Sequence, residues 1–256
     1  ICQVFTVTGG GAMHLNDSLG HHPGLSCLYH HHEQAAAMAA EAYARVDNRM
    51  AAVCVTSGPG ATNAITGALC AWMDSIPMLV LSGQVRYDTT VRHSGLKIRT
   101  MGVQEYDITP SVEPMTKYAV MVTDPLTIRY HLERAIYLAK TGRPGPCWLD
   151  LPLNVQSAVV ETDDLKAYDP SEDAKELPAP VSEETVKQIL EKLKLASQPL
   201  IFSGHGIRLA AAYDEFQHLV ELLGIPVVTG MSSIDLMESA HPLYVGRNGG
   251  TGNRPG

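Results

Sequence analysis

Short runs of consecutive apolar residues alternate with longer segments of helical periodicity over the first part of the chain. The apolar runs predict β-strands at residues 3–7, 26–30, 51–56, 78–82 and 147–151. The segments between them predict helices near residues 11–19, 33–45, 61–72 and 125–140. The runs AAVCVT and MLVLS are apolar throughout, which is typical of strands covered by helices on both faces. The pattern therefore predicts an α/β fold with a doubly wound parallel sheet over residues 1–157.

The pattern changes beyond this first domain. Residues 158–181 are acidic and poor in large apolar side chains, which is typical of a solvated linker. Residues 182–256 begin a second α/β pattern, with a helix at 182–196 opened by the capping-like SEET. Two strands are expected there, at 200–203 and 225–229, and a helix from GHGIR to about residue 223 separates them. Because two strands are few for a domain and the chain has no initiator Met, we expect a partial chain with a truncated second domain.

The composition and charge of the chain argue against nucleic acid or a membrane as a partner. The chain has 256 residues, 45% of them hydrophobic, and a formal net charge of -8. No cluster of Lys and Arg occurs, so nucleic acid is not an expected partner. No apolar run reaches the length that spans a membrane, and a membrane partner is not expected either. The five cysteines include no CxxC pair, which favours reduced thiols in a cytoplasmic protein.

Glycine-containing turns follow three of the predicted strands. They are GGG at 9–11, SGPG at 57–60 and SG at 82–83. The carboxyl ends of parallel strands share one edge of a sheet, where ligands bind. Glycine allows a close approach of backbone to ligand, and helix N-termini offer free N–H groups. Since Glu33 follows the strand at 26–30, the sequence predicts a ligand site formed by Gly10, Glu33, residues 57–63 and Gly83.

Glu33 has two interpretations at this stage. It begins an alanine-rich helix, and a carboxylate there stabilises the positive end of the helix dipole. Alternatively it carries a proton in catalysis, which requires support from the rest of the chain. The preceding HHH at 30–32 is not expected to bind a metal, because consecutive side chains in an extended segment point to opposite faces. His32 remains a candidate for contact with a substrate.

Longer motifs supply that support. EQAAAMAAEAYAR, followed by VTSGPGATNAITGALCAWMDSIPMLVLSGQV, resembles the pyrimidine-binding domain of thiamine-diphosphate enzymes, and in particular the acetolactate synthase (acetohydroxyacid synthase) group. VQEYDI, TKYAV and GRPGPCWLDLPLNVQ extend the resemblance to residue 156. The second unit resembles the central domain of these enzymes, which is Rossmann-like and in some members holds FAD. The resemblance implies 2-keto acid substrates, branched-chain amino acid biosynthesis, and a homodimer or homotetramer with active sites at subunit interfaces.

The resemblance also implies roles for individual residues. In that family the glutamate at the position of Glu33 hydrogen-bonds N1′ of the aminopyrimidine of thiamine diphosphate. It favours the imino tautomer, whose nitrogen removes the proton from C2 of the thiazolium. Gln104 matches a glutamine that faces the reacting centre. The implied cofactor-binding positions are Gly10, Ala12, Thr56, Gly58, Pro59 and Asn63.

The sequence departs from the family pattern at two places. TMGV at 100–103 replaces the usual Asp-Ala-Phe before Gln-Glu, and residues 86–100 form a longer stretch than expected. The Gly-Asp-Gly motif that holds the diphosphate and Mg²⁺ does not occur, so we expect Mg²⁺ to be bound by a domain outside this chain. GHGIR at 204–208 lacks the third glycine of a dinucleotide-binding turn, so the sequence favours a plain strand-to-helix connection over FAD binding without excluding FAD.

Three hypotheses remain open on this basis. The first is an acetolactate synthase-type carboligase that uses pyruvate as donor. The second is a related thiamine-diphosphate enzyme, namely a decarboxylase, a C–C hydrolase or another carboligase. The third is a non-catalytic dimerising fragment that lacks the diphosphate domain.

Overall fold

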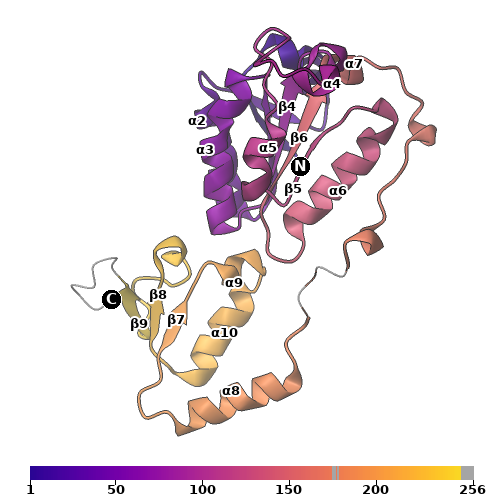
Figure 1. Ribbon diagram of the computed structural model, residues 1–256. Helices are drawn as coiled ribbons and strands as arrows, with labels where there is room; N and C mark the ends of the chain where they lie inside the picture. Colours follow the sequence, from indigo (N-terminus) through magenta and orange to yellow (C-terminus); the bar gives the residue numbers. More distant parts are fainter. Residues whose placement is uncertain (175–176, 178, 249–256) are drawn as a thin grey trace. The chain divides into compact units, whose positions relative to one another are not determined.

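The structure, a computed structural model, describes residues 1–174, 177 and 179–248. The chain forms two compact units, Ile1–Leu177 and Pro178–Gly256, each described here by itself (Figure 1). None of the helices in the described residues combines the length and the apolar character needed to cross a membrane.

The first unit is built on a six-stranded sheet in the order β2-β1-β3-β4-β6-β5. Every neighbouring pair is parallel, so the predicted doubly wound parallel sheet is confirmed. The strands are β1 (Gln3–Thr6), β2 (Ser26–Tyr29), β3 (Ala51–Val55), β4 (Met78–Gln84), β5 (Tyr118–Met121) and β6 (Pro146–Pro152). The sequence pattern did not predict β5, a four-residue edge strand that is mostly half-buried, although YAVM is an apolar run.

Helices connect these strands across both faces of the sheet. The α-helices are α1 (Met13–His21), α2 (Glu33–Asp47), α3 (Pro59–Asp74), α4 (Val91–Ser94), α5 (Thr109–Val112), α6 (Ile128–Lys140) and α7 (Leu153–Gln156). Short 3₁₀ helices occur at η1 (Gly10–Ala12), η2 (Tyr87–Thr89), η3 (Glu113–Met115), η4 (Pro125–Thr127), η5 (Thr162–Asp164) and η6 (Pro170–Glu172).

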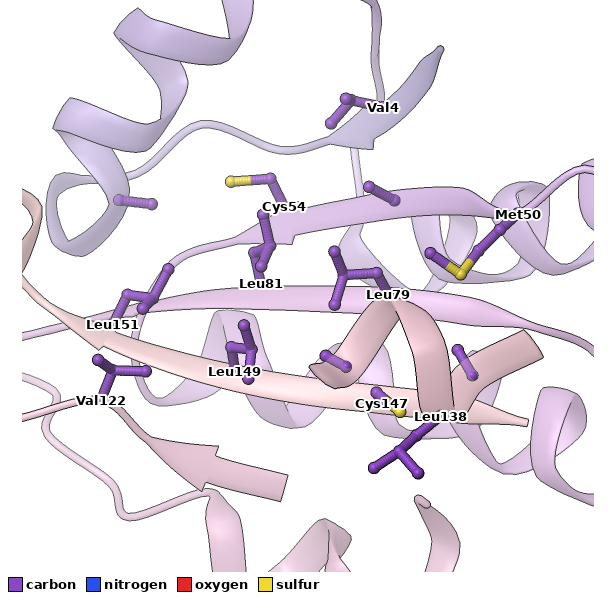
Figure 2. Packing of buried hydrophobic residues seen from close by; sticks show 14 of the residues in the cluster. Val4, Met50, Cys54, Leu79, Leu81, Val122, Leu138, Cys147, Leu149 and Leu151 are labelled. Carbon is purple, nitrogen blue, oxygen red and sulfur yellow. The ribbon is translucent and has the colours of Figure 1, made fainter. Parts of the chain in front are cut away.

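The face of the sheet covered by α1 and α6 holds a continuous apolar core. Leu79 and Leu81 of β4 lie beside Leu149 and Leu151 of β6, because alternate residues of paired strands share one face (Figure 2). Leucines and isoleucines of α1 and α6 pack over them. Burial at this density makes the sheet a rigid support for the turns that leave its strands.

The opposite face is covered by α2 and α3, which pack on each other through small residues. Their buried side chains are Ala36, Ala37, Ala40 and Ala44 of α2, and Ala61, Ala64, Ala68 and Ala71 of α3. The approach is closest at Gly67, where an added Cβ would lie 2.5 Å from the Cβ of Ala37 and 2.7 Å from its carbonyl carbon. The alanine-rich sequence of α2 is therefore explained by a neighbouring helix that leaves no room for larger side chains.

Part of the segment expected as a solvated linker packs against α6. Asp173 accepts hydrogen bonds of 2.9 and 2.8 Å from the guanidinium of Arg134, and a third of 2.7 Å from the hydroxyl of Tyr168. Arg134 lowers the pKa of Asp173, and the ring of Tyr168 is buried against Tyr130 and Tyr137. Residues 168–173 thus belong structurally to the first unit.

The second unit contains a three-stranded parallel sheet in the order β7-β8-β9. Its elements are α8 (Glu183–Leu195), β7 (Ile201–Ser203), α9 (Gly206–Leu209), α10 (Tyr213–Leu223), β8 (Val227–Thr229), η8 (Met231–Ser233) and β9 (Tyr244–Arg247). Ser182 caps α8 by accepting from the N–H of Thr185, as SEET predicts. The helix predicted from GHGIR onward is two helices, interrupted at Ala211 with φ 54°. The strand β9, which contains a glycine and is largely exposed, was not predicted.

The contact between α2 and α3 gives a test of this packing. Replacing Gly67 with Ala should lower the free energy of unfolding by about 1–3 kcal/mol, because the new methyl group meets the backbone of Ala37. Gly20→Ala in α1 is the matched control, since its added Cβ meets only the flexible end of Tyr29 at 3.2 Å and helix propensity favours alanine. Urea unfolding followed by tryptophan fluorescence measures both, because Trp72 and Trp148 lie in the first unit. Equal stabilities of the two variants would contradict the proposed packing.

Candidate functional site

Two glycine-containing turns meet at the carboxyl edge of the six-stranded sheet. The N–H of Gly11, after β1, donates a 3.0 Å hydrogen bond to Oγ1 of Thr56, after β3. A Cβ at Gly9 would overlap the side chain of Thr56, so glycine is required for this approach. Together with neighbouring residues these turns form a surface that we call the rim, made of residues 9–12, Glu33, residues 56–63, Gly83 and Gln104.

Glu33 faces the rim. Its half-buried carboxylate accepts, at Oε2, a 3.0 Å hydrogen bond from Nδ2 of Asn63 in the first turn of α3. The helix cap of α2 is provided by His32, whose Nδ1 accepts from the N–H of Gln34 at 3.1 Å. His32 therefore caps α2 by hydrogen bond, while the carboxylate of Glu33 bonds Asn63 of the neighbouring helix α3.

One oxygen of the Glu33 carboxylate lies beside Gly60 in the first turn of α3. A Cβ at Gly60 would lie 3.4 Å from Oε1 of Glu33 and 2.7 Å from Cγ2 of Thr56. Among the described residues, Asn63 is the donor to this carboxylate and it bonds Oε2. Oε1 thus lies beside a glycine, in a position where no side chain of α3 covers it.

Gly10 and Ala12 lie in the same turn but in different environments. Gly10 is exposed, and an added Cβ there would meet nothing within 4 Å. Ala12 is fully buried in the apolar core beneath the turn. The carbonyl oxygen of Gly11 packs on Gly83, where a Cβ would overlap it, and accepts a 2.7 Å hydrogen bond from Nε2 of Gln156. Gly10 therefore borders open space, and its turn is fixed by the burial of Ala12 and by the hydrogen bond from Gln156 to Gly11.

Gln104 reaches the rim from a distant part of the sequence. Its carbonyl oxygen lies against Gly58, where any Cβ would overlap it. Both residues have left-handed backbones, with φ 55° at Gly58 and φ 58° at Gln104. Gln104 is exposed, and so is Pro59, which occupies the first turn of α3. The structure thus brings all eight sequence-predicted site residues to the rim or directly beneath it.

Other candidate groups lie elsewhere or have structural roles. In the part of the chain that the structure describes, no cluster of three or more His, Cys, Asp or Glu side chains is placed to hold a metal ion. Burial raises the pKa of the Cys54 and Cys147 thiols to about 12, as expected for core cysteines. In the second unit, Gly204 and Gly206 form a short connection between β7 and α9 and border open space.

Sequence reasoning missed a buried polar group beneath the rim. Asp150 on β6 accepts hydrogen bonds from the hydroxyl of Ser82, at 2.6 Å, and from Nε2 of Gln84, at 3.1 Å. Its side chain is 1% exposed, and burial raises its pKa to about 7. The sequence does contain an indication of this group, because Asp150 is the single carboxylate within the apolar run CWLDLP and a buried apolar strand does not need a charged side chain for packing.

Comparison of the chain with known proteins identifies its family. Residues 1–105 match the N-terminal TPP binding domain of the thiamine pyrophosphate enzymes, and residues 186–256 match their central domain. The chain belongs to the thiamine pyrophosphate enzymes. The first match covers the turns after β1, β3 and β4 and the start of α2, and so includes the whole rim.

Individual relatives extend the similarity over nearly the whole chain. The acetolactate synthase large subunits of Lactococcus lactis and Corynebacterium glutamicum are 35% and 37% identical to it, each over 96% of the chain. Acetolactate synthase 1, chloroplastic, of Oryza sativa is 33% identical over 95% of the chain. The chain spans about two fifths of the length of these relatives, with shares of 41%, 38% and 36%.

The contact between Gly58 and Gln104 can be tested without the cofactor. Gly58→Ala should reduce the free energy of unfolding by more than about 2 kcal/mol, because it combines left-handed strain with overlap on the Gln104 carbonyl. Gly95→Ala is the control for a positive φ without overlap: its φ is 63°, its ψ of 6° tolerates alanine better than the ψ of −114° at Gly58, and an added Cβ meets nothing within 4 Å, so it should lose only about 1 kcal/mol. Urea denaturation of both variants checks this, and equal losses would show that the turn relaxes without cost.

Proposed function

We propose that this chain supplies the pyrimidine-binding half of a thiamine-diphosphate-dependent carboligase of the acetolactate synthase type. Such an enzyme decarboxylates a 2-keto acid, with pyruvate as donor, and joins the two-carbon unit to a second 2-keto acid. The observation that carries the proposal is the Glu33–Asn63 pair at the rim, between the open turn at Gly10 and the Gly58 turn. Relatives named acetolactate synthase align with 96% of the chain and support the choice of reaction.

When bound, thiamine diphosphate would supply a thiazolium carbon that serves as nucleophile and electron sink. The role of Glu33 is to hold a proton between its Oε1 and N1′ of the aminopyrimidine. Asn63 restricts rotation of the carboxylate by donating to Oε2, which leaves Oε1 for the cofactor. The flat aminopyrimidine would lie against the turns after β1 and β3, where Gly10 presents backbone rather than a side chain.

The remaining groups are assigned by position. Gln104 is proposed to contact the substrate, because it is exposed at the rim and its backbone contacts Gly58. Mg²⁺ and the diphosphate are proposed to be held by a Gly-Asp-Gly segment, which does not occur in residues 1–256. We place that segment in a second subunit, so that the active site forms at a dimer interface.

Substitution of Glu33 tests its assigned role. In the intact protein that contains this chain, Glu33→Gln should bind thiamine diphosphate but slow hydrogen–deuterium exchange at C2 by about 10²-fold or more, because an amide cannot carry the proton. Exchange is measured by NMR of the bound cofactor after acid quench. Glu41→Gln is the control: this carboxylate lies on the same helix and pairs with Arg45, so its loss should lower stability and leave exchange unchanged. Unchanged exchange in Glu33→Gln would exclude the role.

A product assay distinguishes the reaction types. Incubation of the intact protein with pyruvate, thiamine diphosphate and Mg²⁺ should yield acetolactate, detected by NMR. Acetaldehyde as the sole product would instead assign a decarboxylase. Exchange at C2 without any product from pyruvate would retain the cofactor chemistry and reject pyruvate as donor.

A further inference from the structure

The backbone that follows Gln104 is held by three consecutive anchors. The carboxylate of Glu105 accepts from the N–H groups of Val91 and Met101, both at 3.0 Å. The carboxylate of Asp107 accepts two bonds from Arg92, at 2.7 and 2.9 Å. These two anchors stay within the loop between β4 and α5. The third leads into the sheet, because the carbonyl oxygen of Tyr106 accepts a 2.8 Å bond from Nε2 of Gln84 on β4.

The amide of Gln84 has one orientation that satisfies all its neighbours. Nε2 donates to Tyr106 and also to Oδ2 of Asp150, while Oε1 accepts from the N–H of Val85 at 3.0 Å. Reversing the amide would place Oε1 against two acceptors and Nε2 against a donor. Gln84 is 1% exposed, so water does not replace these bonds. Asp150 thus accepts the second hydrogen of Nε2 and reinforces the orientation in which Gln84 holds the Tyr106 carbonyl.

The buried carboxylate of Asp150 is unfavourable for the stability of the fold. Both of its described side-chain bonds come from neutral donors, the hydroxyl of Ser82 and the amide of Gln84, and Ser82 itself accepts from Nε1 of Trp148 at 2.8 Å. The charged groups that act on it through space are Asp107, which raises its pKa, and Arg92, which lowers it and is paired to Asp107. A buried carboxylate without a bonded cation costs stability that an apolar side chain would not. This cost indicates a role other than packing.

We propose that Asp150 and Gln84 are positioning residues, which hold the Tyr106 carbonyl and thereby set Gln104 against Gly58 for contact with the substrate. The inference rests on the proposed function of the rim. Gln104 is two residues from Tyr106, so displacement of the Tyr106 carbonyl would shift the backbone that sets the Gln104 carbonyl against Gly58. The anchor is strongest when Asp150 is charged, since a carboxylate accepts a stronger bond than a neutral acid.

The test measures pH dependence in the intact protein with thiamine diphosphate, Mg²⁺ and pyruvate. In the wild type, kcat/KM should fall as pH decreases through about 7, where Asp150 becomes protonated. Asp150→Asn should lose this acidic fall in kcat/KM and show a kcat/KM about threefold to tenfold below the wild-type plateau, because its single amide oxygen cannot accept from both Ser82 and Gln84 and no bond to it is charge-assisted. Exchange at C2 should remain within about twofold of wild type, since Glu33 is not part of the anchor.

A second variant retains the Asp150 carboxylate, so the inference can be tested even if Asp150→Asn does not fold. Ser82→Ala removes a donor that stabilises the charged form of Asp150, so the acidic limb should move to higher pH. Thr116→Val removes a buried hydroxyl that bonds the Val112 carbonyl, outside the anchor, and should leave the limb in place. Folding of each variant is checked by circular dichroism, because Ser82→Ala removes the acceptor of the Trp148 indole and would alter its fluorescence directly.

Three outcomes would overturn the inference. One is a pH profile of Asp150→Asn that superimposes on that of the wild type. Another is an equal movement of the limb in Ser82→Ala and Thr116→Val. The third is a loss of C2 exchange in Asp150→Asn that is as large as its loss of turnover. That result would show a general defect of the site and not a misplaced Gln104. Failure of the proposed function is distinguishable, because the wild type itself would then give no product from pyruvate, with or without exchange at C2.

Discussion

The close contact between α2 and α3 is the constraint on which the rim depends. Alanines on both helices and Gly67 at the nearest point bring the two backbones together. Because both helices start at the carboxyl edge of the sheet, the same contact brings Glu33 of one within hydrogen-bond distance of Asn63 of the other. A larger side chain in the middle of either helix would separate their ends, and the carboxylate would lose the donor that orients it.

The rest of the rim is assembled by backbone rather than by side chains. Gly9, Gly58 and Gly83 each lie where a Cβ would overlap a neighbouring turn or loop. The turns after β1, β3 and β4 can therefore touch one another directly, and the sheet beneath them transmits its rigidity to the site.

Sequence patterning predicted the elements whose signal is strong and local. Continuous apolar runs located five strands of the first sheet, and the alanine-rich run located α2 to within two residues. The strand β9 was missed because a short, half-exposed edge with a glycine and an arginine carries little hydrophobic signal, whereas β5 was missed although its residues YAVM are apolar. The eight site residues were assigned through the resemblance, and their meeting at one edge follows from the parallel topology.

The polar contacts around the site could not be predicted from periodicity. Gln84 and Asp150 are adjacent to apolar residues on their strands, and nothing in the pattern indicates that they bond one another or the Tyr106 carbonyl. The same is true of Gln156, which supports Gly11 from 145 residues away. These contacts depend on strand register, which becomes known only when the sheet is assembled.

The pairing of Asp173 with Arg134 has a practical consequence for anyone dividing this protein for expression. A fragment ending at residue 157, where the regular α/β pattern stops, would keep the guanidinium of Arg134 and the aromatic surface of α6 but discard the carboxylate and the Tyr168 ring that cover them. It would expose tyrosine faces to solvent and invite self-association. Ending the fragment after Asp173 retains the covering peptide and is the sounder place to cut.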